Sequence, residues 1–300
     1  ATLLVGSPKH NQTQDGTGAV HSVRLSTLQD FSIAELAVPP LLPSGYVRRV
    51  SALRPGAVHW PAEMDLTAEF GKHLAPIGDV NGDGFMDIAV TAGQQVFSGV
   101  NTGGIFVAFL SSDGLSALGG NVIHLSSPGM GPVGSQGLAS RLGTAIGSAG
   151  DVDQNGVPDL VTAADGLSHF IILLLKVDGS VLRSHTTIAS DAGLSSTLLS
   201  STAAQVEGVA SSVQGQPPVA SRELLLLTPS MNLGPLSNAG SVHFVSVDAS
   251  GSAVGGHSVS SVDLGAAAAD ARFGQSAVLT PDIDGDGNCD LVVGAPGLSG

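Results

Sequence analysis

The feature that most constrains this chain is a nine-residue pattern, Asp-x-Asp/Asn-x-Asp/Asn-Gly-x-x-Asp, that occurs three times. The copies are DVNGDGFMD (79–87), DVDQNGVPD (151–159) and DIDGDGNCD (282–290). Short apolar stretches flank each copy, so the longer segments 70–93, 142–165 and 273–296 align without gaps. Self-similarity of this kind indicates a repeat architecture, in which copies of one small unit pack against their neighbours.

A weakened fourth unit lies between the second and third copies. The first two aligned segments begin 72 residues apart, and the third begins 131 residues after the second, which leaves room for one more unit. AAQVEGVASS (203–212) resembles the start of such a unit, and the residues from Leu224 onward resemble its second half. The Asp-rich pattern is replaced there by VQGQPPVASRE (213–223), so we expect this unit to bind no metal.

The second half of each unit also repeats, as an apolar strand, a turn and another strand. This pattern occurs in 103–120, 169–185 and 240–256. Residues 3–26 have it without the preceding half. Asp-Gly at 113–114 and at 178–179 predicts a two-residue type I′ hairpin, because Asp and Gly tolerate positive φ. Each complete unit is therefore predicted to form four short strands.

Four-stranded antiparallel units of this length are typical of the blades of a β-propeller, which pack around an axis. The sequence thus predicts an all-β fold, a β-propeller with about four to five blades present as part of a larger ring. The predicted segments are a partial blade (1–30), a blade (70–141), a blade (142–202), a degenerate blade (203–272) and a partial blade (273–300). The partial blades favour an excerpt of a longer propeller; a ring closed by the two ends together is the alternative.

Residues 31–69 interrupt the repeat. This segment contains five prolines, the single Trp60 and the single Tyr46, together with Arg48, Arg49 and Arg54. We expect an insertion or long loop at the rim of the propeller, or simply an ordinary long connection. Aromatic and Arg side chains are enriched where proteins bind partners, so this segment is the predicted partner surface.

The composition excludes several classes of protein. A formal net charge of −14 argues against a nucleic-acid partner, which requires a basic face. Only 12 % of the residues are charged, which is unlike a disordered chain. The single cysteine, Cys289, excludes a disulfide scaffold. There is no G-x-S-x-G motif and no H-x-x-x-H pair, and the Gly-rich segment 143–150 lacks the Lys of a phosphate loop, so we expect no enzyme.

The Asp-rich pattern has the chemistry of a calcium loop. Oxygen side chains at positions 1, 3 and 5 of a tight turn converge, Gly at position 6 permits the turn, position 7 offers its carbonyl and Asp at position 9 completes the shell. The predicted calcium ligands are Asp79, Asn81, Asp83, Asp87 and the Phe85 carbonyl; Asp151, Asp153, Asn155, Asp159 and the Val157 carbonyl; and Asp282, Asp284, Asp286, Asp290 and the Asn288 carbonyl. The sequence thus predicts three Ca²⁺ sites, with the second weaker because it has one acid fewer than the third.

These motifs together resemble FG-GAP repeats, the blades of the integrin α-subunit head and of related surface and secreted proteins. The resemblance rests on FG at 70–71 and 273–274, on the three Asp-rich loops and on GAP at 294–296. It implies a propeller that is typically seven-bladed, with calcium in loops on one face, in an extracellular or lumenal setting. Departures are Leu142-Gly143 in place of FG, and TAG and TAA in place of GAP in two units.

The sequence thus predicts a non-enzymatic, calcium-stabilised propeller at the cell surface that binds a protein or glycan partner. A structural repeat subunit of an extracellular filament or coat, which would assemble with itself, is the alternative. An accessory domain of a glycan-processing enzyme is a third hypothesis. Asn11 begins an Asn-Gln-Thr sequon and is the candidate glycosylation site. The longest apolar run, 170–175, is too short to cross a membrane.

Overall fold

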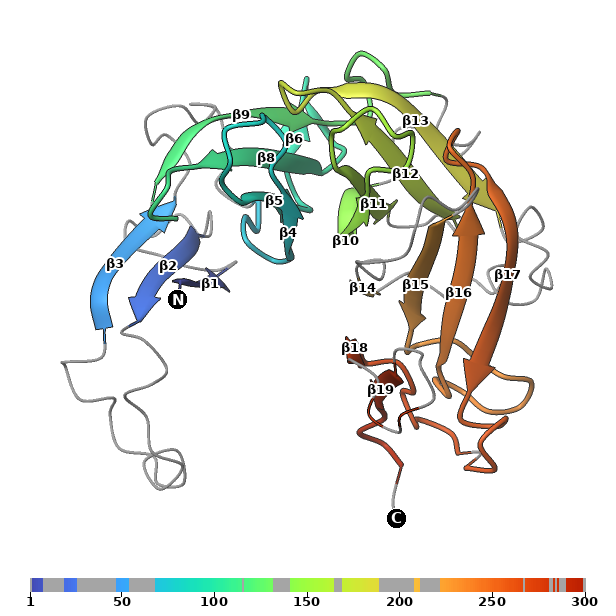
Figure 1. The fold of residues 1–300 in the computed structure, drawn as a ribbon. Coiled ribbons are helices and arrows are strands. Elements are labelled where there is room, and N and C mark those ends of the chain that lie inside the picture. Colours follow the sequence, from blue (N-terminus) through green and yellow to red (C-terminus); the bar gives the residue numbers. More distant parts are fainter. Residues whose placement is uncertain are drawn as a thin grey trace.

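The regular elements of this protein are antiparallel β-strands wherever its structure, a computed structural model, describes the chain. The described residues are 2–7, 19–25, 47–53, 68–114, 116–131, 141–164, 169–188, 208–210, 222–266, 268–280, 283, 285 and 290–298. The sheets follow one another around a curved arc, with β1–β3 at one end and β18–β19 at the other (Figure 1). None of the described residues belongs to a helix that could cross a bilayer.

Three of the sheets have four strands in the order of the chain. The first contains β4 (Leu74–Gly78), β5 (Asp87–Ala92), β8 (Gly104–Leu110) and β9 (Ala117–Ile123), with the small hairpin β6 (Val96–Phe97) and β7 (Val100–Asn101) inserted. The second contains β10 (Leu142–Gly150), β11 (Asp159–Ala164), β12 (His169–Leu175) and β13 (Val181–Ile188). The third contains β14 (Gly208–Ala210), β15 (Arg222–Thr228), β16 (Ser241–Val247) and β17 (Ala253–Ser260).

Two smaller sheets lie at the ends of the arc. One contains β1 (Thr2–Ser7), β2 (Ala19–Leu25) and β3 (Val47–Leu53), and the other contains β18 (Ser276–Thr280) and β19 (Asp290–Gly294). The predicted all-β fold with four-stranded antiparallel blades is confirmed, and the unit without an Asp-rich loop also forms a four-stranded sheet.

One strand lies where the sequence predicts a loop. β3 falls inside the segment 31–69 and pairs with β2 in antiparallel register, so the expectation of a loop is wrong for residues 47–53. Val47, Val50 and Leu53 favour an extended strand, and β2 offers an edge for pairing. The rest of the segment lies outside the described residues, apart from Ala68 and Glu69.

Neither Asp-Gly pair forms the predicted type I′ turn. Only the glycine of each pair, Gly114 or Gly179, has positive φ, whereas a type I′ turn needs it at both central residues. Gly179 donates to the carbonyl of Lys176, and the N–H of Lys176 donates to the Ser180 carbonyl. This is a three-residue loop with a glycine bulge, and β16–β17 are joined by the same turn at Gly251.

Packing between blades forms the core. The first strands lie toward the inside of the arc and β9, β13 and β17 lie toward the outside (Figure 1). One cluster combines Ala75, Ile105 and other residues of the β4–β9 blade with Leu160, Leu173 and other residues of the β10–β13 blade. Burial of each such aliphatic side chain contributes about 1.5–3 kcal/mol, so neighbouring blades stabilise each other.

The FG position is a second junction between blades. Leu142, which stands where other units have Phe, donates its N–H to the Thr102 carbonyl of the preceding blade at 2.8 Å. Phe273 donates in the same way to the carbonyl of Ala239 at 3.0 Å. The glycine that follows has φ of +86° at Gly71 and +90° at Gly143, values that favour glycine. At Leu142 and at Phe273, the FG position is therefore a point at which a blade joins the one before it.

Candidate metal centres

Each Asp-rich loop connects the first strand of a blade to the second. The loop of 79–86 joins β4 to β5, and that of 151–158 joins β10 to β11. The glycine at position 6 has positive φ in both loops, as the sequence predicts, at Gly84 and Gly156. Position 4 also has positive φ, at Gly82 (+77°) and Gln154 (+60°). This second left-handed position was missed, although Gly82 was a signal for it.

The aspartate at position 1 fixes the turn of its own loop. Asp79 accepts the backbone N–H groups of Gly82 (2.8 Å), Asp83 (3.0 Å) and Gly84 (2.7 Å). In the second loop, Asp151 accepts the N–H groups of residues 155 and 156, both at 3.0 Å. These bonds hold the position 1 carboxylate inside the turn, as an Asx turn does.

The aspartate at position 9 is buried where the second strand begins. Asp87 accepts the N–H groups of Val80 (2.9 Å) and Leu110 (3.0 Å). Asp159 accepts the equivalent N–H groups at 2.7 and 2.8 Å, from residues 152 and 175. Both carboxylates are fully buried. Position 9 therefore ties the loop to the third strand of the blade.

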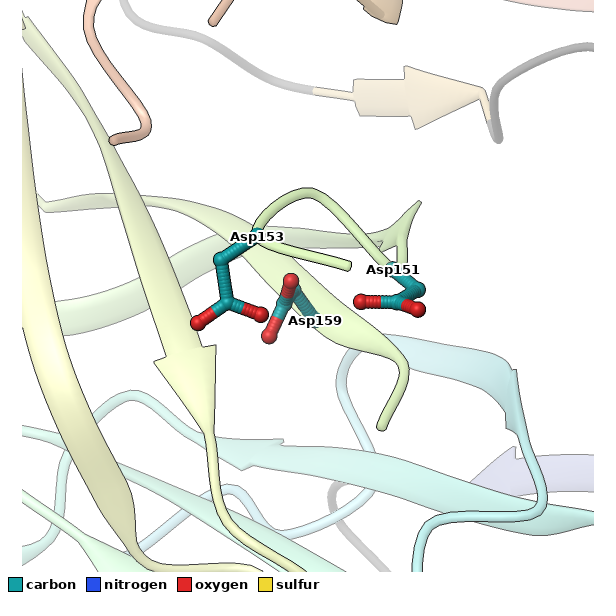
Figure 2. A group of neighbouring side chains, drawn as sticks. All are labelled: Asp151, Asp153 and Asp159. Carbon is teal, nitrogen blue, oxygen red and sulfur yellow. The ribbon is translucent and has the colours of Figure 1, made fainter. Parts of the chain in front are cut away.

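The second loop brings three carboxylates together. Asp151, Asp153 and Asp159 have oxygen atoms within 4.8 Å of one another, and Figure 2 shows the three side chains side by side. Among the described residues this is the only such group of three acidic, His or Cys side chains. The closest convergence thus lies in the loop for which the sequence predicts the weaker site.

Burial dominates the electrostatics of this group. Burial raises the pKa of the Asp159 carboxyl to about 7, against the lowering effect of its two N–H donors, and the neighbouring Asp153 and Asp151 raise it further. Burial also raises the pKa of Asp87, opposed by the N–H groups of Val80 and Leu110. A carboxylate that is desolvated beside like charges is destabilised unless a cation is near.

Other predicted ligands are engaged in local hydrogen bonds. Asn155 Oδ1 accepts the Val157 N–H at 2.7 Å, and its Nδ2 donates to the Leu175 carbonyl at 3.1 Å. In the first loop, Asn81 Nδ2 donates to Asp83 Oδ2 at 2.9 Å. The first loop therefore has its position 3 and position 5 side chains bonded to each other.

The residues at position 7 differ in exposure. The Phe85 side chain is 42 % exposed, whereas that of Val157 is only 5 % exposed. The carbonyl of this residue is the predicted ligand in both loops, so the second loop presents it from a more firmly packed position.

Only part of the third loop is described. Asp290 accepts the N–H of Ile283, which repeats the bond from position 2 to position 9 of the other loops. The remaining predicted ligands Asp282, Asp284, Asp286 and Asn288 lie outside the described residues, as do Asn11 and Cys289.

The second loop fits a hard divalent cation. Its donor set consists of carboxylate, amide and carbonyl oxygens, the ligands that Ca²⁺ prefers. Within the described part of the chain, none of its three carboxylates forms an ion pair with a basic side chain. A cation would supply the positive charge that this cluster, with Asp159 buried and Asp151 and Asp153 half-buried, lacks.

Comparisons with known proteins agree with the repeat. The family model described as FG-GAP repeat matches residues 70–107 and 273–300. The chain is 40 % identical to mouse integrin alpha-IIb over 167 residues, which is 55 % of this chain and 13 % of that protein. It is 34 % identical to integrin alpha-3 of Cricetulus griseus over 142 residues, which is 46 % of this chain and 12 % of that protein.

A third relative is likewise similar to this chain over only part of its length. Integrin alpha-V of Gallus gallus is 30 % identical over 110 residues, which is 36 % of this chain and 10 % of that protein. The chain thus spans a small part of the length of these relatives. The matched residues include the FG at 70–71, the first Asp-rich loop and the GAP at 294–296. The chain thus contains FG-GAP repeats at 70–107 and 273–300 and is similar to integrin α subunits over part of its length.

Proposed function

We propose that this chain is a non-enzymatic β-propeller module of a cell-surface or secreted protein, that its Asp-rich loops bind calcium, and that it binds a protein or glycan partner. The observation that carries the proposal is the group formed by Asp151, Asp153 and fully buried Asp159, in a loop whose sequence pattern occurs three times. Repetition at the same place in each unit favours a cation site over a chance cluster of acids.

The role of the cation in this proposal is structural. Asp159 already holds the N–H groups of Val152 and Leu175, so it links the loop to the third strand of the blade. Asp151 holds the N–H groups of the turn itself. A bound Ca²⁺ offsets the repulsion between these carboxylates and joins the tip of the loop to its base.

The proposed calcium sites and the relatives both favour an extracellular location. Loops of side-chain and carbonyl oxygens in extracellular modules bind Ca²⁺ with dissociation constants of about 10⁻⁴–10⁻³ M, which suits the calcium levels outside cells. The relatives that the chain matches are named as integrin α subunits. Adhesion through a protein or glycan partner is the function that this kinship favours for the propeller.

Calcium titration by isothermal calorimetry tests the proposal. We expect the purified chain to bind Ca²⁺ with sub-millimolar to millimolar affinity, and to bind Mg²⁺ more weakly, because Mg²⁺ loses its water reluctantly. Asp153→Asn should remove one binding event and leave the others. A wild-type chain that gives no heat with 10-fold more Ca²⁺ than the expected dissociation constant (about 10 mM) would overturn the proposal.

A further inference from the structure

The first and second Asp-rich loops touch each other across the boundary between two blades. Gly78 directly precedes the first loop and pairs with Asp87, while Pro158 is position 8 of the second loop. A Cβ added to Gly78 would lie 3.1 Å from Cγ of Pro158, so the residue that leads into the first loop lies against the ring of Pro158 in the second loop. A side chain at residue 78 would therefore require the Pro158 ring to shift by a few tenths of an ångström.

Residues of the two loops also belong to one hydrophobic cluster. Val80 and Val157 are 1 % and 5 % exposed and belong to one cluster, which also contains Leu175. Val80 donates its N–H to Asp87, the position 9 carboxylate of the first loop. Val157 contributes the predicted carbonyl ligand of the second loop. Val80 therefore bonds a predicted ligand of the first loop, and Val157 is itself a predicted ligand of the second loop.

Leu175 connects this cluster to the second site by two further bonds. Its N–H donates to Asp159 at 2.8 Å, and its carbonyl accepts Asn155 Nδ2 at 3.1 Å. Leu175 therefore joins the cluster that contains Val80 and Val157 to two predicted ligands of the second loop. Interfaces packed this tightly deform little, so neighbouring sites order together.

We propose that the first and second loops are a coupled pair in which calcium binding at one raises the affinity of the other. The inference rests on the proposed calcium sites. The first binding event fixes Gly78 and Val80, which fixes Pro158 and Val157, so the second event has less conformational entropy to lose. Linkage requires the effect to be reciprocal between the two loops.

The other side of the second loop has no metal loop to couple with. Val152, at position 2, packs with Leu224 and Val247 of the next blade, and that blade lacks the Asp-rich pattern. Val80 and Val152 occupy the same position in their loops, and both donate to the position 9 aspartate. They therefore form a matched pair, of which Val80 shares a hydrophobic cluster with a residue of another Asp-rich loop and Val152 does not.

Calorimetric calcium titrations of the full chain can isolate the coupling. The variant Asp282→Asn keeps the calcium sites of the first and second loops. Adding Asp79→Asn to it leaves only the site of the second loop. Adding Asp151→Asn in place of Asp79→Asn leaves only the site of the first loop. We expect the two-loop variant to bind the second of its two ions at least about 5-fold more tightly than the single-loop variants predict. In this background, Val80→Ala should reduce the excess affinity and Val152→Ala should preserve it.

The outcomes separate this inference from the proposed function. If the two-loop isotherm equals the sum of the two single-loop isotherms, the loops bind calcium independently and the coupling is refuted, while the sites themselves stand. If Val152→Ala removes the excess affinity as fully as Val80→Ala, the coupling does not pass through the contact between the loops. If the Asp282→Asn variant binds no calcium, both the sites and their coupling are refuted. Circular dichroism of each variant confirms that it is folded.

Discussion

The carboxylate of Asp159 accepts the backbone N–H of Val152 at 2.7 Å, across seven residues of the second Asp-rich loop. The same bond joins Asp87 to Val80 in the first loop at 2.9 Å. This aspartate therefore has two roles, since it is a predicted calcium ligand and also the residue that fastens the loop to its blade. Substitutions in the loop should separate these roles.

Asp159→Ala should destabilise the chain with or without calcium. It leaves the N–H groups of Val152 and Leu175 buried without an acceptor, which costs about 3 kcal/mol or more. Asp153→Ala is the matched control, because Asp153 accepts only one N–H, that of Asn155 at 3.2 Å. Urea denaturation in EGTA should show a large loss for Asp159→Ala and a small one for Asp153→Ala. Equal losses would refute the fastening role.

The pH dependence of stability should reveal the buried Asp159. Burial raises the pKa of its carboxyl from the usual value of 3.8 to about 7, so the folded state favours the protonated form. In EGTA, its contribution to stability is therefore full below about pH 4 and is lost as the pH rises through about 7. Added calcium competes with this proton, so its stabilising effect should grow over the same range.

Thermal melts at pH 5, 6, 7 and 8 in EGTA and in calcium measure this dependence. Asp159→Asn cannot titrate and should remove this part of the pH dependence. A calcium-induced shift in melting temperature that is as large at pH 5 as at pH 8 would contradict the account.

A buried histidine should make the degenerate blade sensitive to acid. His243 on β16 is fully buried, its Nε2 lies 2.8 Å from Thr228 Oγ1, and its Nδ1 has no hydrogen-bond partner among the described residues. Burial lowers the pKa of His243 to about 4. The folded state therefore favours the neutral ring, and stability is lost as the pH falls from about 6.5 to about 4, by about 3 kcal/mol.

His243→Phe tests this dependence with a side chain that the fold accepts elsewhere. Phe106 occupies the same position when 103–110 is aligned with 240–247. Urea denaturation at pH 4.5 and 6.5 should show a smaller loss of stability on acidification for this variant than for the wild type. The same loss in both would exclude His243 as the cause.

Gln154→Gly should stabilise the second loop. Gln154 has φ of +60°, whereas the same position in the first and third loops is Gly82 and Gly285, with φ of +77° and +83°. A non-glycine residue in this region costs about 1–2 kcal/mol, of which the greater freedom of unfolded glycine returns a part, so we expect a gain of about 0.5–1 kcal/mol. Gln154→Ala is the control and should bring no gain in the melting temperature.

Gly103→Ala should loosen the junction between two blades. A Cβ at Gly103 would lie 2.3 Å from the Leu142 carbonyl oxygen, so the strand would have to move away from the FG position of the next blade. Gly99→Ala is the matched control, because Gly99 also has positive φ but has no atom within 4 Å of its added Cβ. Denaturation should show a loss about 2 kcal/mol larger for Gly103→Ala. Equal losses would mean that the junction yields easily.

Much of this fold could be predicted because it is local and repeated. The Asp-rich pattern and the strands around it recur with the same alignment, so strand pairs such as β4–β5 and β10–β11 follow from the sequence. The strand at 47–53 could not be predicted, because prolines on both sides suggest a loop and its partner β2 is more than 20 residues away. The hairpin type was wrong because Asp-Gly also suits longer loops, of three residues between Lys176 and Ser180 and of four between Ser111 and Ser116.

The candidate site also has features that the sequence predicts and features that it does not. The ligand types and their spacing can be read from the sequence, because they repeat. The burial of Asp159, its pKa and the contact between Gly78 and Pro158 cannot, because they depend on how two blades pack. Likewise the first and second loops each contain three aspartates, but among the described residues only those of the second loop lie close together.

Whether the Asp-rich loops hold a stabilising cation is decided by the melting temperature of the purified chain with and without calcium. Replacing EGTA with 5 mM Ca²⁺ should raise the melting temperature by several degrees, since each site with a dissociation constant of about 0.5 mM adds about 1.4 kcal/mol. The rise should be lost in the combined variant Asp79→Asn, Asp151→Asn, Asp282→Asn. The same melting temperature in EGTA and in calcium for the wild-type chain would contradict a stabilising cation in these loops.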